Sequence, residues 1–412
     1  MNDYSSGYVE GGNAGQLTLI GKTVVLDGML DGSVEPGIYQ TEASEPEDEH
    51  GNQTVRGRKE PRGGTLVIGD SNALTQLKES RDFVVDEVVV KSEAAPLPEG
   101  FGPDSELSSY LESSLYYEDQ TPLHQTLLSA EKLNMAGLSN LEIYTNTRFK
   151  TEKDARISLR PGNWEEGWKD DNGNFIGAFS VTARNVEHQG EISLPAGMVN
   201  LTVTDNKTSN IGGGDYVSME QRIYLADGSS ILTRGEEIDN SLAGDGTRES
   251  VMSGHINAGK VVIKDKTHLG NGVILKQGAV IDVTGGYEID ERGKFSGGDA
   301  GILELQGSTL ALEGDIRGHS LAGNKGGTIV LHAENVEVSR SAPALPLDFK
   351  FDSDIPDDLK GKLILAENRL DQTGFTHAAL RSVYDLTVEE DVNFSPSRVK
   401  LADPGAGKRR GV

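Results

Sequence analysis

The chain has no cysteine among its 412 residues, so it can form no disulfide, no thiolate metal site and no cysteine nucleophile. This absence suits a protein that is exported unfolded, because an early disulfide would block threading. Aromatic residues make up only 6% of the sequence and hydrophobic residues 35%, while glycine is frequent at 51 residues. The composition favours a narrow core with many turns over a wide globular core.

Long apolar runs are missing as well. No stretch approaches the ~18 residues of a membrane-spanning helix, so we expect no membrane insertion. The opening residues, MNDYSSGYVEGG, carry neither the basic nor the apolar region of a signal peptide. Either the protein stays inside the cell or the chain is one piece of a longer protein. The start within a repeat pattern and the basic end, GKRRGV, favour a piece of a longer protein.

Positive charge is also scarce. The net charge of −26 disfavours nucleic acid and anionic membranes as partners. We interpret the acidic residues as a charged surface. It keeps a long exposed β-structure soluble and prevents its strands from pairing with neighbouring molecules.

What the sequence does contain is a strand pattern, clearest from Gly297 to Val338. Aliphatic residues such as Leu303 and Leu305 alternate with small or polar ones and would share one face of a strand. A helix is excluded, because residues i and i+2 lie on opposite sides of it. Short strands with glycine corners predict a solenoid of stacked coils, about 20–25 residues each. The positions expected to face inward are Leu17, Leu19, Leu26, Leu303, Leu305, Leu312, Ile329 and Leu331.

The same pattern occurs a second time near the N-terminus. Residues Gly11–Gly32 align with Gly297–Gly318 without a gap. Further along, GGTLVI (from Gly63) corresponds to GGTIVL, and AEKLNMAGLSNLEI (from Ala130) corresponds to AENRLDQTGFTHAAL. Three landmarks in one order predict an internal duplication. The chain then divides into a first repeat block, middle coils and a second repeat block, at residues 1–162, 163–296 and 297–412.

Three insertions interrupt the coils: a charged loop at 41–62, an excursion at 96–123 and a proline-rich segment at 342–358. Insertions between coils are where solenoids carry function, so the first loop is a candidate contact surface, although a tolerated surface insertion is the favoured explanation. In the excursion, Leu107, Leu111 and Leu115 recur every four residues, which predicts a short helix.

Aromatic residues in polar segments are the candidate binding residues. Trp164 and Trp168, the only tryptophans, lie in a polar turn, and Tyr116 and Tyr117 lie in the excursion. Exposed rings of this kind can stack on sugars, so we predict contacts with a glycan or receptor. For the two tryptophans, burial against the flank of a coil is the favoured explanation, since an indole gains most from burial.

With these motifs in view, the chain resembles the filamentous-haemagglutinin family of large bacterial exoproteins. The resemblance rests on GGNAGQLTL and LDGMLDG, GGDAGILEL and LEGDIRG, and ARNVEHQGEISLPAG. It implies a right-handed parallel β-helix and export through an outer-membrane β-barrel transporter by two-partner secretion. The family's secretion domain, with its Asn-Pro-Asn signatures, is not in this chain, so an internal or C-terminal portion of the shaft is expected.

An enzyme is the main alternative to an adhesin shaft. A β-helix polysaccharide lyase or hydrolase would need converging carboxylates, for which Asp170 and Asp171, with Glu165 and Glu166 nearby and Lys169 alongside, are the candidates. Their turn composition favours an acidic turn instead. The histidines, including His255 and His319, are scattered without the spacing of a zinc site. We therefore expect no enzyme, no metal and no cofactor.

These inferences converge on a prediction of function. The chain is expected to be part of the shaft of a secreted or surface-displayed adhesin of a Gram-negative bacterium. Its partners would be the transporter during export and then a host-cell, glycan or bacterial surface receptor. A polysaccharide lyase or hydrolase and the shaft of a contact-dependent toxin exoprotein are the alternatives.

Overall fold

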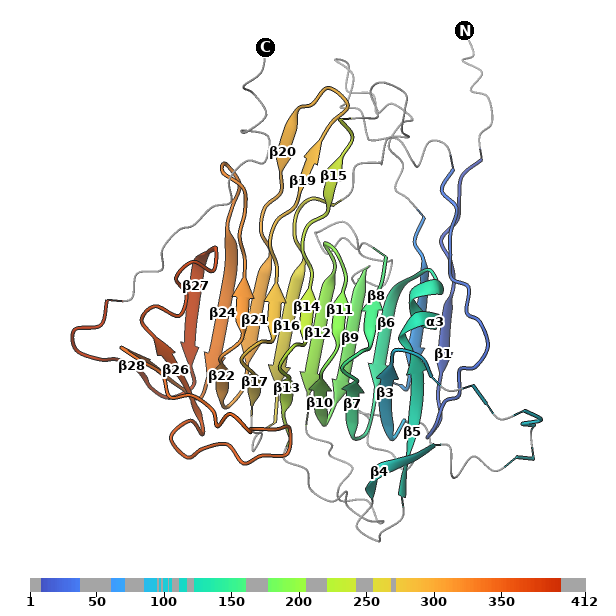
Figure 1. Cartoon of the computed structure of the whole chain (residues 1–412), viewed down its shortest axis with the longest axis horizontal. Coiled ribbons are helices and arrows are strands. Elements are labelled where there is room, and N and C mark those ends of the chain that lie inside the picture. The colour runs from blue at the N-terminus through green and yellow to red at the C-terminus, as the bar shows by residue number, and fades with distance from the viewer. Residues whose placement is uncertain are drawn as a thin grey trace.

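The protein is almost entirely β-structure, as a computed structural model shows (Figure 1). Twenty-eight strands and one six-residue helix are described, and most strands belong to long parallel sheets, which confirms the predicted all-β class. The structure describes residues 9–37, 61–70, 85–94, 96–97, 99–102, 104–105, 111–116, 122–160, 177–204, 221–241, 255–267 and 272–393.

The first sheet has nine strands, all paired in parallel and arranged in chain order along the long axis of the molecule (Figure 1). Its strands are β1 (Gln16–Leu19), β2 (Gly64–Ile68), β6 (Leu138–Tyr144), β9 (Ala178–Ala183), β12 (Met198–Val203), β16 (Lys260–Asp265), β21 (Ile302–Gln306), β24 (Gly327–Ala333) and β27 (Phe375–Ser382).

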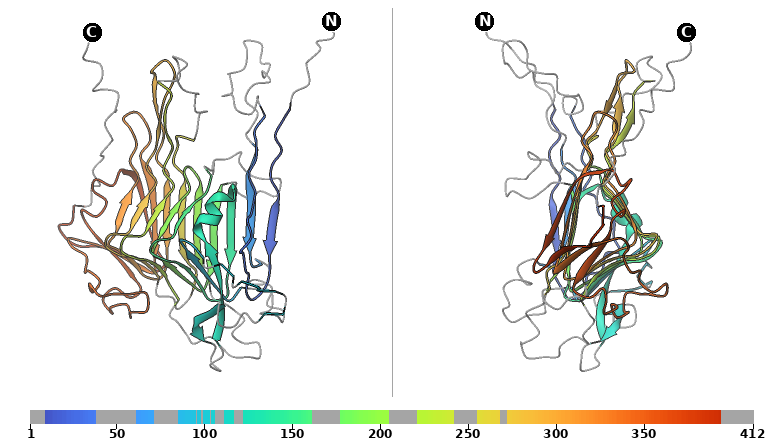
Figure 2. Two further views of the ribbon diagram at one scale, coloured as in Figure 1. Left: turned by 45° about the vertical axis from the view of Figure 1, so that its right-hand side comes forward. Right: turned by 90° about the vertical axis from the view of Figure 1, so that its left-hand side faces the viewer.

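The second sheet has eleven strands, parallel except for the edge strand β4. In spatial order these are β28 (Leu386–Val388), β25 (Asn335–Ser339), β26 (Lys362–Ala366), β22 (Leu310–Leu312), β17 (Val273–Leu275), β13 (Ile223–Leu225), β10 (Asn185–His188), β7 (Arg148–Thr151), β3 (Glu87–Lys91), β5 (Pro122–Ser129) and β4 (Glu112–Tyr116). Figure 2 looks along the stack in its right-hand view, where the strands of the large sheets overlie one another.

Two smaller sheets complete the architecture. The five-stranded sheet is parallel, whereas β20 pairs antiparallel to β19 in the three-stranded sheet, in which the Tyr287 and Phe295 rings stack with centroids 5.6 Å apart. The first contains β23 (Asp315–Arg317), β18 (Val280–Asp282), β14 (Ser230–Leu232), β11 (Glu191–Ser193) and β8 (Arg156–Ser158). The second contains β15 (Glu237–Asp239), β19 (Tyr287–Ile289) and β20 (Phe295–Gly297).

The chain visits the sheets in turn. From β9 it passes to β10 in the second sheet, to β11 in the five-stranded sheet and back to β12 beside β9. This circuit is 20 residues long, since Met198 pairs with Ala178. The next is 62 residues long, because Lys260 pairs with Met198. The predicted spacing of 20–25 residues is therefore wrong for most circuits, which carry insertions between their strands.

Ladders of aliphatic side chains fill the space that the sheets enclose. In the five-stranded sheet, one isoleucine of each strand lies beside that of the next, and all five are almost fully buried. The ladder consists of Ile157, Ile192, Ile231, Ile281 and Ile316. Equal β-branched side chains in register pack closely across adjacent strands, which is how very short strands stabilise a sheet.

The nine-stranded sheet contributes two further ladders, which include most of the positions expected to face inward. Leu303, Leu305, Ile329 and Leu331 are buried, and Leu19, Leu26 and Leu312 are partly buried against the same core. Leu17 differs: it continues a ladder through its pairing with Leu66, yet 42% of it is exposed. It lies on the end strand β1, where no further described strand covers it.

The excursion before residue 123 departs from the sequence prediction in part. In the part that is described, Glu112–Tyr116 forms strand β4 instead of a helix, and it pairs antiparallel to β5. Leu111, just before the strand, is helical, and residues 106–110 lie outside the described residues, so a strand replaces the predicted helix only from Glu112 onward. Further along the chain, helix α3 spans Ala130–Met135, and Ser129 caps its N-terminus by accepting a hydrogen bond from Lys132 N.

The two aligned halves of the sequence make matching contacts. Asn13 Oδ1 accepts a hydrogen bond from Arg62 N at 2.9 Å, and Asp299 Oδ1 accepts one from Lys325 N at 2.8 Å. The pairing of β2 with β6 shifts register after Gly64, and that of β24 with β27 shifts after the equivalent Gly327. A side-chain bond and a β-bulge therefore recur at equivalent positions.

The proline-rich insertion covers the outer face of the eleven-stranded sheet. Phe349 and Phe351 lie against Tyr224, whose hydroxyl donates to the Phe349 carbonyl at 3.2 Å. The almost fully buried Arg222 donates from Nη1 to the Ser353 carbonyl at 2.6 Å. Burial of these rings, together with Leu345, Ile355 and Leu359, fixes the insertion to the sheet.

Candidate functional site

The predicted contact residues lie mostly outside the described residues. This applies to Trp164, Trp168 and Tyr117, and to the carboxylates Asp170 and Asp171. Tyr116 is the last residue of β4, the edge strand of the eleven-stranded sheet. A candidate site must therefore be built from other side chains.

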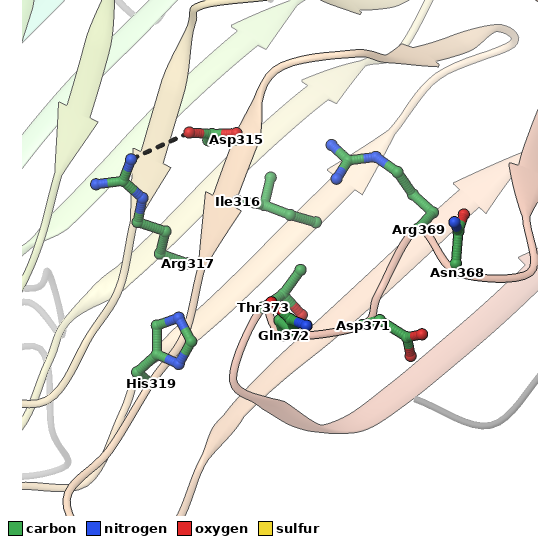
Figure 3. Close-up of a pocket in the computed structure, with 9 residues that line it drawn as sticks. All are labelled: Asp315, Ile316, Arg317, His319, Asn368, Arg369, Asp371, Gln372 and Thr373. Carbon is green, nitrogen blue, oxygen red and sulfur yellow. Dashed lines mark hydrogen bonds and ion pairs between the residues drawn. The ribbon is translucent and has the colours of Figure 1, made fainter. Parts of the chain in front are cut away.

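A polar pocket of about 400 Å³ lies at the free edge of the five-stranded sheet. Strand β23 and the residues that follow it form one wall, and the turn after β26 forms the other (Figure 3). Strand β23 pairs only with β18 in this sheet, so a space remains between its outer edge and the turn. The lining residues are Asp315, Ile316, Arg317, His319, Asn368, Arg369, Asp371, Gln372 and Thr373.

Two arginines give the pocket its cationic groups. Arg317 Nη2 lies 3.0 Å from Asp315 Oδ2, and both side chains are well exposed on the outer face of β23 (Figure 3). Arg369 is held more firmly: Nε donates to the Leu312 carbonyl at 2.9 Å, and Nη2 donates to the Gly314 carbonyl. Burial lowers the pKa of the Arg369 guanidinium, while the charge of Asp315 acts in the opposite direction.

The remaining lining is also polar. His319 follows β23, and its buried Nδ1 has no hydrogen-bond partner among the described residues. Asn368 and Gln372 add amide groups from the opposite wall, as Figure 3 shows. Guanidinium, imidazole, amide and carboxylate groups in one open pocket can donate to and accept from a hydroxyl-rich ligand. The arrangement is suited to binding such a ligand.

The first half of the sequence places different side chains at the equivalent positions. Lys132 aligns with Arg369, and its Nζ contacts the Asp27 carbonyl as Arg369 contacts the carbonyls of Leu312 and Gly314 at the end of β22. Met29 and Asp31, however, align with Asp315 and Arg317. The cation that fixes the turn is thus common to both halves, whereas the exposed ion pair of the pocket occurs only in the second.

A second polar cluster lies on the eleven-stranded sheet, across β3, β7 and β10. Arg148 Nη2 is 2.6 Å from Glu87 Oε1, and its Nη1 is 3.2 Å from Glu187 Oε2. The Arg148 guanidinium also lies over the Phe351 ring, 5.9 Å from its centroid. All three charged side chains are nearly buried. Two carboxylates that share one arginine in this way form a structural ion network.

Three further features bear on function. The described residues contain no group of three His, Asp or Glu side chains placed to hold a metal ion. Within the same ranges, no helix is long and apolar enough to span a membrane. His255 lies near the three-stranded sheet, where its backbone N donates to Glu236 Oε2 at 2.7 Å.

Sequence reasoning considered His319 only as a corner residue and did not consider Arg369. The signal for Arg369 was the alignment of AEKL with AENRL, which retains a cation in an otherwise variable turn. The exposed pair Asp315 and Arg317 carried no such signal, because charged residues two apart on a strand are ordinary on a solvated face. Comparison of the chain with protein-family models, curated proteins and solved structures gave no match.

Proposed function

We propose that the chain is a right-handed parallel β-helix and part of the shaft of a secreted, surface-displayed adhesin of the filamentous-haemagglutinin type. The observation that supports this most is the uninterrupted parallel pairing of all nine strands of the first sheet. Each circuit contacts mainly its neighbours, so such a stack can lengthen into a rod without enlarging its core. A rod of this kind projects its insertions and pockets away from the cell.

The pocket at the edge of β23 is the proposed receptor contact. Its mixed charges and amides suit a carbohydrate with hydroxyl and carboxylate groups, as found on host-cell and bacterial surfaces. Export would use an outer-membrane β-barrel transporter, and the absence of cysteine is compatible with threading in an unfolded state. The chain itself would carry out no reaction.

Binding by the purified chain tests this function. The full chain, coated on beads, is expected to bind host-cell or bacterial surfaces and members of a panel of acidic glycans. Arg317→Ala should weaken binding about tenfold, the cost of one lost charge-assisted hydrogen bond. Arg340→Ala is the matched control, because Arg340 is also exposed and paired with a carboxylate, 3.4 Å from Asp391 Oδ2, outside the pocket.

Location supplies a second test. In the bacterium that makes the protein, protease added to intact cells should degrade it, or it should be found in the medium. Retention inside intact cells, or beads that bind no surface or glycan, would refute the adhesin function. Conversion of a polysaccharide by the chain would instead favour the lyase or hydrolase alternative.

A further inference from the structure

The inward ladders of the nine-stranded sheet end in exposed residues. One ladder joins Leu17 to Ala378 and the other joins Leu19 to Leu380, each through the seven strands between. Every intervening member is at most 1% exposed. At the two ends, Leu17 and Ala378 are exposed, and Leu19 and Leu380 are only partly buried.

The eleven-stranded sheet ends in the same way. On its last strand, β28, Leu386 and Val388 are 48% and 57% exposed, although their partners Val336 and Val338 are buried. Most of the large exposed hydrophobic residues of the described chain lie near the two ends of the stack. These are Val9, Leu17, Ile20 and Met29 at one end, and Val383, Tyr384, Leu386 and Val388 at the other.

The outer edges of β1 and β27 have no strand partner among the described residues. The equivalent strands of the other half of the sequence show which kind of strand pairs with such an edge. Strand β21, the counterpart of β1, pairs on the corresponding edge with β16 in parallel. Strand β6, the counterpart of β27, pairs on its corresponding edge with β9, again in parallel. The edges equivalent to both outer edges therefore pair with a parallel strand elsewhere in this chain.

We infer that the two ends bind each other, so that a second copy of the chain stacks head to tail on the first. The direction is compatible, because all strands of the sheet are parallel. In the register of the ladders, Leu17 of one copy would lie beside Ala378 of the other, and Leu19 beside Leu380. In the second sheet, Val24 and Leu26 would cover the exposed side chains of β28.

A head-to-tail contact joins two different surfaces, so it does not close on itself as a symmetric dimer does, and it generates a filament. It would cover the apolar ends and the strand edges that no described strand pairs with, and such edges otherwise favour uncontrolled aggregation. The net charge of −26 opposes the association of two copies. Salt screens that repulsion, so the assembly should strengthen as ionic strength rises. The inference depends on the stacking alone and not on the adhesin function.

Sedimentation velocity of the full chain over a range of protein and salt concentrations tests the inference. The unchanged chain should form oligomers larger than a dimer, and their size should increase with protein concentration. Leu17→Lys at one end and Ala378→Lys at the other replace exposed residues, so folding should persist, as circular dichroism would verify. Each variant alone should remain monomeric, and an equimolar mixture should form a dimer and nothing larger, since only one compatible pair of ends remains.

Leu347→Lys is the control, because Leu347 is 94% exposed in the insertion that covers the sheet and lies away from both ends of the stack. This variant should assemble like the unchanged chain. A chain that stays monomeric at every concentration and salt would overturn the inference and would indicate that segments of the same chain cover the ends. A series that stops at a dimer in the unchanged chain, or a mixture of the variants that stays monomeric, would equally overturn it.

Discussion

The hydroxyl of Thr151 lies 2.7 Å from Nδ1 of His188, and both side chains are fully buried in the aliphatic core. On the other side of the ring, His188 Nε2 lies 3.0 Å from the Ser230 carbonyl. A carbonyl only accepts, so Nε2 carries a proton, and because burial disfavours the charged imidazolium, Thr151 is the donor to Nδ1. The imidazole is therefore neutral within a core of aliphatic ladders.

Stability should fall in acid because of this histidine. Burial lowers the pKa of His188 from 6.5 to about 4, so the unfolded chain binds its proton more readily than the folded chain does. The stabilisation is complete above pH 6.5 and is lost as pH falls towards 4, by on the order of 3 kcal/mol. Urea unfolding at a series of pH values measures it. The double variant Thr151→Val/His188→Leu, which removes both polar partners, should lose this component, whereas His377→Gln at an exposed histidine should keep it.

Substitution of an interior ladder residue should destabilise the stack. Leu305 is 1% exposed and lies between Ile263 and Leu331 in the register of the sheet. Leu305→Asp places an unpaired carboxylate in the core, at a cost of several kcal/mol. Gln306→Asp, on the outward face of the same strand, should change the unfolding free energy by less than about 1 kcal/mol. Equal thermal unfolding of the two variants would contradict the assignment of faces.

The buried ion network makes a separate prediction. Arg148→Met leaves Glu87 and Glu187 close together without their shared cation, and should cost about 3–5 kcal/mol. Lys260→Met removes a cation 2.8 Å from Glu304 on a more exposed face. A surface pair of that kind contributes about 0–1 kcal/mol, so this control should unfold almost like the unchanged chain. Similar unfolding midpoints for both variants in urea would show that the Arg148 network adds nothing.

Glycine is required at position 374 for two reasons, its positive φ and its close approach to a neighbouring segment, and variants can separate the two. Gly374 has φ +83°, and a Cβ there would lie 2.5 Å from backbone atoms of His319. Gly323 also has a positive φ, of +100°, but a Cβ there would meet nothing within 4 Å. Gly323→Ala should therefore cost about 1–2 kcal/mol from backbone strain alone. Gly374→Ala should cost clearly more, and calorimetric melting temperatures of the two variants would show whether close approach adds to the strain.

Strand positions followed from two-residue alternation because burial on one face is a local property of the sequence. That is why Leu303, Leu305, Ile329 and Leu331 were predicted to face inward and are buried. Strand order was not predictable in this way. Strand β26 lies between β22 and β25, although β25 precedes it in the chain, because the insertion leads back across the sheet. The alternation of apolar and polar residues shows which face of a strand is buried, but not which strand lies beside it.

The candidate site was harder to predict, because its residues come from separate segments. Arg317 and Arg369 line one pocket only because β23 has no strand beyond it and the turn after β26 lies opposite. The leucine spacing around Leu111 favoured a helix, and Leu111 itself is helical, but the helix does not continue into Glu112–Tyr116, because propensity is weak where an adjacent strand offers backbone hydrogen bonds. Pairing with β5 decided that segment in favour of a strand.

Distances between spin labels test the stacking most directly. The chain has no cysteine, so pairs introduced for labelling are the only reactive thiols. Thr18, Asn200 and Ala379 lie in one outward row of the nine-stranded sheet, with Asn200 four strands from Thr18 and Ala379 eight. At about 4.8 Å per strand, Thr18→Cys/Asn200→Cys should give about 19 Å and Thr18→Cys/Ala379→Cys about 38 Å. Two distances in a ratio near two would agree with parallel stacking in this order. Distances that do not grow with the number of strands between the labels would contradict it.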